Sequence, residues 1–207
     1  MIQPISPLRE ETNTRRILPI LEFAAAHNSE RSHDEQVMKN ALQIFDQLSP
    51  LHGLSEDERF LLQAASLLHD IGWSQGGSAH HKSGQRLVFR DRSLPLGKKE
   101  RSMISLLVRY HRKALPSLKH RRFAELKEKN REKVMVLASI LRIADGLDRS
   151  HQSLVENIIV TISPRKVIIH CSSRKDGYAE YDYGMQRSDL FSRVFNREVV
   201  IEWSVAC

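Results

Sequence analysis

The sequence predicts a mostly α-helical domain over residues 12–150, followed by a small α+β segment over residues 151–207. Three observations support this fold class. Apolar residues recur at helical spacing from about Thr12 to Asp148. After Ser150 the pattern changes to β-branched runs that are typical of strands. The chain has 207 residues, of which 41% are hydrophobic, and this is enough for a substantial core without disulfides.

Breaks in the helical pattern divide the first part of the chain into an arm and a series of helices. Two prolines within residues 1–11 predict a flexible arm. Thr12 or Thr14 would cap the first helix. Ser55 and Glu58 form a capping-box pair that would open the third. The expected helices are, in order, from 12 or 14 to about 24, 32–48, 55–72, 80–90, 98–111 and 131–149.

The remaining segments are expected to be less regular or extended. The basic segment 112–133 is expected to be exposed and partly helical. Pro164 and Arg165 predict a turn between two β-branched runs. The expected elements after residue 150 are strands at 156–163 and 166–171, a helix near 188–194 and a strand at 198–203, which make a ββαβ unit.

Composition excludes several classes of protein. The chain has 32 Lys+Arg against 25 Asp+Glu, a formal charge of +7, which suits phosphate-bearing partners. Cys171 and Cys207 do not make a disulfide framework, so we expect a reducing, cytoplasmic location. No apolar run is long enough to span a membrane, and the N-terminus lacks a signal peptide's hydrophobic region. The case for a nucleic-acid partner would rest on the net charge alone, so we do not expect one. The sequence leaves open whether the chain forms a homo-oligomer.

Polar side chains fall on the apolar faces of four expected helices. His69, for example, lies four residues after Ala65 and seven after Leu62, and residues at this spacing share one helix face. The same argument places further polar groups on apolar faces, namely His33, His111 and Asp145, while Asp70 adjoins His69.

These inward polar groups predict a metal site. A single buried histidine is usually a hydrogen-bonded core residue, but burying an unpaired carboxylate is costly, since even neutral polar groups cost roughly 2–7 kcal/mol on transfer scales. One divalent cation would offset this cost for all of the groups, because imidazole nitrogen and carboxylate oxygen are its natural ligands. The sequence does not distinguish Mn, Fe, Mg, Zn, Co and Ni.

The order of these motifs resembles the H…HD…D signature of HD-domain metal-dependent phosphohydrolases. The likeness is closer to the C-terminal HD-like domain of the exopolyphosphatase/guanosine pentaphosphatase (Ppx/GppA) family, and it covers roughly residues 12 to 152. The stretches that carry it are TRRILPILEFA, ALQIFDQLSPLHGLSEDERFLLQAASLLHDIGW, SAHHKSGQRLV, SLLVRYHRKALP and VLASILRIADGLDRSHQ.

The resemblance implies an HD-type helical bundle with one or two divalent ions. The first ion would be held by His33, His69, Asp70 and Asp145, with His69 and Asp70 at the catalytic centre. A second ion would be bridged by Asp70 and held by His111 and one of two adjacent histidines. His80 is preferred over His81 because it precedes Gly84 by four positions, but Ser83 stands where the family often has a further histidine, so the choice stays open.

The resemblance also implies a function. We expect water activated by metal to hydrolyse a soluble phosphorylated metabolite, such as a nucleotide or guanosine-polyphosphate. The alternative is a non-catalytic regulatory module that binds polyphosphate or a nucleotide. Larger family members hydrolyse polyphosphate in an N-terminal actin-like module, which we expect this chain to lack, so exopolyphosphatase activity is not carried over. Candidate phosphate-binding residues next to the motifs are Lys82, Arg112, Lys113, Arg142 and Arg149.

Overall fold

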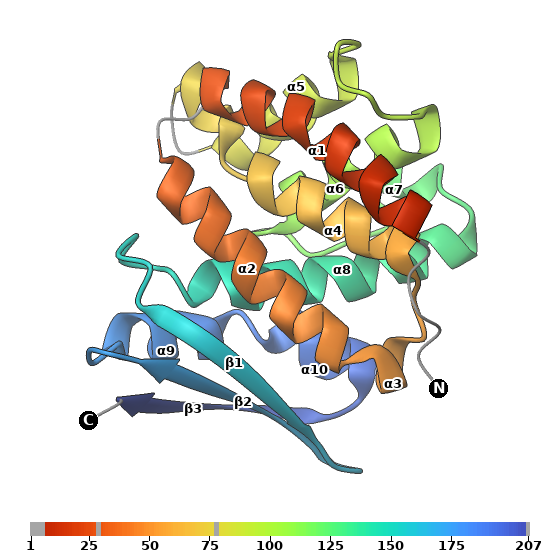
Figure 1. Ribbon diagram of the computed structural model, residues 1–207. Helices are drawn as coiled ribbons and strands as arrows, with labels where there is room; N and C mark the ends of the chain where they lie inside the picture. The colour runs from red at the N-terminus through yellow and green to blue at the C-terminus, as the bar shows by residue number, and fades with distance from the viewer. Residues whose placement is uncertain (1–6, 28–29, 77–78, 206–207) are drawn as a thin grey trace.

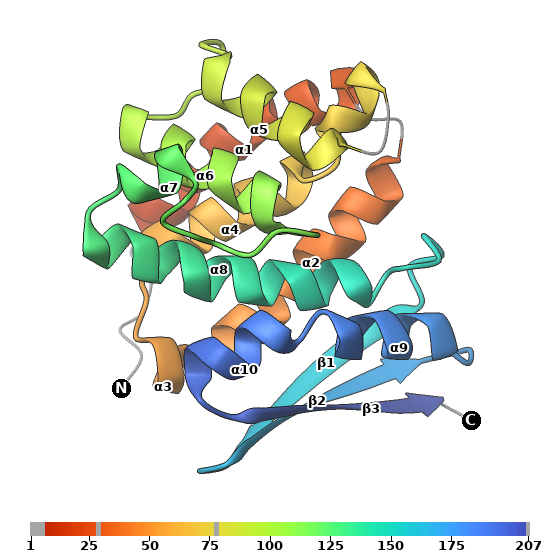
Figure 2. The ribbon, with the colours of Figure 1, turned by 180° about the vertical axis from the view of Figure 1, so that it is seen from behind.

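A layer of helices lies over a small three-stranded sheet in the computed structural model, which describes residues 7–27, 30–76 and 79–205 (Figures 1 and 2). Helices α9 and α10 lie between α8 and the sheet. The helices are α1 (Pro7–His27), α2 (Arg31–Gln47), α3 (Ser49–His52), α4 (Glu56–Leu68), the 3-10 helix η1 (Ile71–Gln75), α5 (His80–Arg90), α6 (Lys98–Tyr110), α7 (Arg121–Ala124), α8 (Glu128–Gly146), α9 (Tyr178–Gln186) and α10 (Asp189–Phe195). The strands are β1 (Val155–Ile162), β2 (Lys166–Ser173) and β3 (Glu198–Val205).

The N-terminal arm differs from its prediction. Helix α1 begins at Pro7, so residues 7–11 are helical rather than a loose arm, and residues 1–6 lie outside the described part of the chain. Proline favours the first helical turn, because its missing N–H would have no partner there and its φ already suits a helix. Pro7 therefore marks the start of a helix and not an irregular segment, while Pro4 lies outside the described residues.

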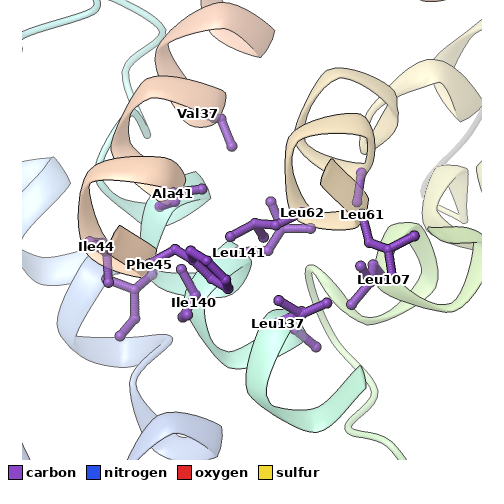
Figure 3. Packing of buried hydrophobic residues seen from close by; sticks show 14 of the residues in the cluster. Val37, Ala41, Ile44, Phe45, Leu61, Leu62, Leu107, Leu137, Ile140 and Leu141 are labelled. Carbon is purple, nitrogen blue, oxygen red and sulfur yellow. The ribbon is translucent and has the colours of Figure 1, made fainter. Parts of the chain in front are cut away.

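The hydrophobic core forms where α2, α4, α6 and α8 meet. Figure 3 shows Ile44, Leu62, Leu107 and Leu141, one from each of these helices, pointing into the same interior. Each of the four is fully buried. The core also continues into the sheet, since Ile169 of β2 belongs to the same buried cluster. The segment after residue 150 is therefore packed onto the helices.

The sheet is held to the helical layer by side chains of α2. Strand β1 pairs antiparallel with β2, and β2 pairs parallel with β3, in the order β1-β2-β3. Gln43 accepts a hydrogen bond from the backbone N–H of Ile158 at 2.7 Å. Gln47 accepts one from Val160 at 2.9 Å and donates one to the Ile158 carbonyl at 2.8 Å. These amides satisfy backbone groups of β1 that would otherwise lie at a free sheet edge.

Helix α9 was not expected from the sequence. It packs against α8 and β3, and its contact with α8 depends on two glycines. A Cβ added at Gly146 would lie 2.9 Å from the Gly184 Cα. The two backbones therefore approach each other more closely than any larger residues would permit. The added helix makes the C-terminal unit ββααβ instead of ββαβ.

The capping box predicted at the start of α4 is present and is extended by an ion pair. The backbone N–H and hydroxyl of Ser55 donate to the Glu58 carboxylate at 3.1 and 2.7 Å. Lys133 of α8 forms an ion pair with the same carboxylate. Burial opposes ionisation of Glu58, but Lys133 and Ser55 outweigh it and lower the carboxyl pKa below its ordinary value of 4.5.

Glu58→Gln is expected to lower the free energy of unfolding by roughly 1–3 kcal/mol at pH 7, because it leaves the partly buried Lys133 without its carboxylate. A lowered pKa stabilises the folded state above the unfolded pKa, and this contribution is lost as the pH falls through the folded pKa. The gap between wild type and variant should therefore shrink below pH 4.5. Urea unfolding at several pH values measures the difference in free energy of unfolding between the two proteins. A difference that is constant with pH would contradict the ion-pair explanation.

No helix among the described residues has the length and apolar character needed to cross a membrane.

Candidate metal centre

Histidine and aspartate side chains from five places in the chain meet at one end of the helical core. They come from α2, from the turn after α4, from the start of α5, from the residue after α6 and from the end of α8. Their helices lie side by side, since α2, α4 and α8 contact one another and α6 contacts both α4 and α8. The members are His33, His69, Asp70, His80, His111 and Asp145.

His33, His69 and Asp70 form the first of two groups with ligand atoms close enough to share an ion. The Nε2 atoms of His33 and His69 lie 3.2 Å apart. Asp70 Oδ2 lies 3.7 Å from His69 Nε2. Asp145 Oδ1 also lies 3.8 and 3.7 Å from the two imidazole nitrogens. The structure thus brings together the four residues expected to hold a first ion.

The hydrogen bonds of the far ring nitrogens show which atoms are free to bind a cation. His33 Nδ1 lies 2.8 Å from the Asp148 carboxylate, and His69 Nδ1 lies 2.7 Å from the Ser66 carbonyl. Both partners only accept, so each Nδ1 carries the proton. In neutral rings the two Nε2 atoms then face each other and Asp70 as unprotonated acceptors. Such an arrangement is repulsive unless a proton or a cation lies among these atoms, and this fits a metal site.

The electrostatics of the protein without metal point to the same need for positive charge. Burial disfavours the charged form of His69, but Asp70, Asp34 and Asp145 outweigh it and raise the imidazole pKa to about 9. Burial likewise opposes ionisation of Asp70, yet His69 and the neighbouring histidines hold its pKa well below the ordinary value. Asp70 therefore stays charged, and a proton on His69 offsets part of the negative charge at the site.

Asp70, His80 and His111 form the second group. Asp70 Oδ1 lies 3.1 Å from His80 Nε2 and 3.5 Å from His111 Nε2. His111 Nδ1 lies 2.7 Å from the Val108 carbonyl, so its Nε2 is also an acceptor, and burial lowers the pKa of this histidine to about 3. Arg112 donates to His80 Nε2 at 3.1 Å. A second ion would have to compete with this guanidinium.

The two adjacent histidines of α5 occupy different surroundings. His80 Nε2 faces Asp70, whereas His81 belongs to neither group of potential ligands among the described residues. The rings of the two histidines lie 6.1 Å apart and are perpendicular. The exposed Trp73 stacks on His80 at 4.0 Å. The geometry thus supports His80 as the ligand candidate.

The predicted phosphate-binding residues have different surroundings. Arg112 contacts His80 and lies beside the ligands. Arg142 is buried and donates to the Tyr110 carbonyl at 3.3 Å and to Asp189 at 3.1 Å, so its guanidinium is already hydrogen-bonded inside the protein. Arg149 lies over the Tyr183 ring.

Lys82 and Lys113 are exposed. Sequence reasoning missed Arg187, which follows α9. It donates to the His111 carbonyl at 3.1 Å and lies 3.8 Å from Asp145 Oδ2. No motif marks this residue, because it reaches the site only through the packing of α9 on α8.

The sequence that forms this site matches a known protein family. Residues 16–190 match the family model described as Ppx/GppA phosphatase, domain III. The chain belongs to this family. The match includes every candidate ligand, and it extends through α9 into α10, so this part of the C-terminal unit lies within domain III. No match was found among curated proteins.

Other side chains of this domain III protein hold His33 in place. Asp148 is fully buried, accepts from His33 and also accepts from the Ser153 backbone N–H at 2.8 Å. The His151 ring stacks on His33 at 3.8 Å with parallel planes, and His151 is itself paired with Glu30. A carboxylate that orients a histidine ligand raises the ligand's basicity and fixes its tautomer.

Asp148→Asn is expected to weaken metal binding by about 10–100-fold, the usual effect of removing a partner that orients a histidine ligand. The amide keeps the shape of the carboxylate but not its charge. Titration of Mn²⁺ or Co²⁺ into metal-free protein measures the affinity, with the exposed Asp176→Asn as the matched control. Equal affinities in both variants would show that Asp148 does not act on the ion.

Proposed function

We propose that this chain is an HD-type, metal-dependent phosphohydrolase that acts on a soluble phosphorylated metabolite. The observation that carries the proposal is the convergence of three imidazole Nε2 atoms on Asp70. His33, His69 and His111 each donate through Nδ1 to a fixed oxygen, so Nε2 is the atom that each ring would offer to an ion. Membership of the Ppx/GppA family supports phosphatase-related chemistry.

The chain's own residues have distinct roles in this proposal. His33, His69, Asp70 and Asp145 would hold one ion, and Asp70 would also face a second ion near His80 and His111. A bound ion lowers the pKa of water toward neutrality and offsets charge on phosphoryl oxygens. Asp70 and Asp145 keep side-chain exposures of 11% and 17%, whereas the histidines are almost fully buried. The carboxylates therefore form the side of the site that a substrate reaches.

Two arginines are placed to bind substrate phosphate at the edge of the site. Arg112 lies against His80 and Arg187 lies near Asp145, so the two guanidinium groups are associated with different ligand groups. Guanidinium groups suit the oxygens of a phosphate, which they can contact in pairs. A phosphoryl group between them would lie beside the carboxylates of both groups.

A second candidate function is a non-catalytic module that binds polyphosphate or a nucleotide. The contact between Arg112 and His80 Nε2 favours it, because this guanidinium already occupies a nitrogen that a two-ion centre would need. Such a module would bind a phosphorylated ligand with one ion or none and would release no phosphate.

Metal content and phosphate release together test the proposal. Elemental analysis of the gently purified full chain, before and after incubation with Mn²⁺ or Fe²⁺, is expected to give at least one equivalent. Phosphate release is then measured on nucleotides and guanosine polyphosphates, with and without chelator. Chelator-sensitive release supports the hydrolase. Ligand binding without release by the metal-loaded protein would support the binding module instead, and no bound metal would overturn the proposed centre.

A further inference from the structure

We propose that a hollow beside α5, α6 and α7 is a second binding site, which takes a small phosphate-bearing anion of the pyrophosphate class without metal. This arginine pocket is lined by Gln85, Arg109, His120, Arg121, Arg122 and Glu125 and has a volume of about 360 Å³. It lies at the lower end of the range of small-molecule sites, roughly 300–1,000 Å³. None of its lining residues belongs to the metal centre.

The charges of the pocket favour an anion. Three of its six lining residues are arginines, and one is acidic. That acid, Glu125, is paired with Arg121 at 2.8 Å, so Arg109 and Arg122 contribute positive charge that it does not offset. All six lining side chains are polar or charged. The occupant that fits is compact, polar and negatively charged.

Two of the arginines are already held in place on the pocket wall. The Arg122 guanidinium lies over the Phe89 ring at 3.5 Å, a cation–π contact that restricts its motion. Arg109 donates one hydrogen bond to Gln85, at 3.3 Å, and its buried Nε has no hydrogen-bond partner. A buried N–H without an acceptor is unfavourable, so this guanidinium has hydrogen-bonding capacity left to use. Fixed guanidinium groups lose less freedom when a ligand binds.

The field around the pocket is positive over a wider area. His120 donates to or accepts from the Tyr110 hydroxyl at 2.9 Å, and burial together with Arg109 and Lys82 lowers its pKa. The positive charges of Arg109 and Lys82 therefore both reach His120 on the pocket wall, and they would attract a polyvalent anion.

Phosphate chemistry fits these groups better than a single carboxylate does. Several oxygens with a charge of minus two or more can contact guanidinium groups from more than one side, and arginine pairs its N–H donors with such oxygens. One carboxylate can engage only one such fork. Arg109, Arg121 and Arg122 come from α6 and α7, so an anion with two phosphates can contact both helices at once.

Calorimetric titration of inorganic pyrophosphate into the metal-stripped full chain, at two salt concentrations, tests the proposal. We expect binding that weakens with added salt. Arg109→Gln and the double change Arg121→Gln with Arg122→Gln should each weaken it at least about tenfold, since charge-assisted hydrogen bonds are lost. If Arg109→Gln does not fold, the double variant on α7 still tests the site. The control is Arg165→Gln, an exposed arginine of the β1–β2 turn, and it should bind as wild type does.

A variant at the metal centre separates the two sites. Arg112→Gln should leave pyrophosphate binding by the metal-stripped protein unchanged within about twofold, whereas binding at the metal centre would be reduced by this change and not by the α7 changes. Three results would overturn the proposal. The first is a loss of pyrophosphate binding in Arg112→Gln alone, and the second is an equal loss in Arg165→Gln and in the α7 double variant. The third is no binding by the wild type. Because no metal is present, these outcomes do not depend on the proposed hydrolysis.

Discussion

Asp70→Ala is expected to remove both candidate ions and to reduce hydrolysis by more than about a hundredfold, beyond the loss that outer partners of a metal ligand produce. Among the described residues, Asp70 is the one that belongs to both groups of potential ligands. Its Oδ2 faces His69 at 3.7 Å and its Oδ1 faces His80 at 3.1 Å. Removing the carboxylate therefore takes a ligand and a negative charge from each ion.

Metal content per chain, measured by elemental analysis, checks this expectation directly. The protein that binds metal should also gain thermal stability when metal is added, since a ligand that binds only the folded state stabilises it, and Asp70→Ala should lose this gain. Asp176→Ala, at an exposed aspartate, is the matched control. Unchanged metal content in Asp70→Ala would contradict the assignment of the centre.

Gly72→Ala is expected to lower the free energy of unfolding by about 3 kcal/mol, the upper end for overpacking in a well-packed interior. A Cβ at this position would lie 1.9 Å from the His80 carbonyl oxygen and 2.6 Å from the Gly84 nitrogen. Both are backbone atoms, so a side chain cannot simply rotate away. The start of α5 would have to shift, and it carries His80 with it.

The same change should separate the two ligand groups. Binding near His33 and His69 is expected to persist, while the group of Asp70, His80 and His111 loses its geometry. Urea unfolding measures the stability and elemental analysis measures the metal. Gly97→Ala is the control, because a Cβ there would meet only the Glu100 side chain at 3.4 Å. If both variants lose the same free energy of unfolding, the close approach of Gly72 to the α5 backbone does not explain the loss in Gly72→Ala.

The periodicity of the helices determined much of the candidate site. His33, His69 and His111 share helix faces with apolar residues, and burying those faces carries the histidines inward whatever the details of packing. All three are almost fully buried and converge with Asp70. Breaks in the same pattern placed α5 from His80 to Arg90 and the capping box at Ser55.

Local pattern alone could not determine which groups meet between elements. Arg142 was expected to bind phosphate. The structure places it on the α8 face that α10 covers, where its guanidinium forms an ion pair with Asp189. Arg187 reaches the centre and Asp148 binds His33 without any spacing that marks them. Helix α9 forms where two glycine backbones meet closely.

The sequence alone thus determined that the domain is helical and that these histidines and aspartates point inward, because an amphipathic helix buries one face. The tertiary structure decided which arginines lie at the centre, which carboxylate orients His33 and where the C-terminal unit packs. These features depend on distances between segments far apart in the sequence, such as the 2.8 Å between His33 and Asp148. Such distances follow from how the helices and the sheet pack together, and no local pattern encodes them.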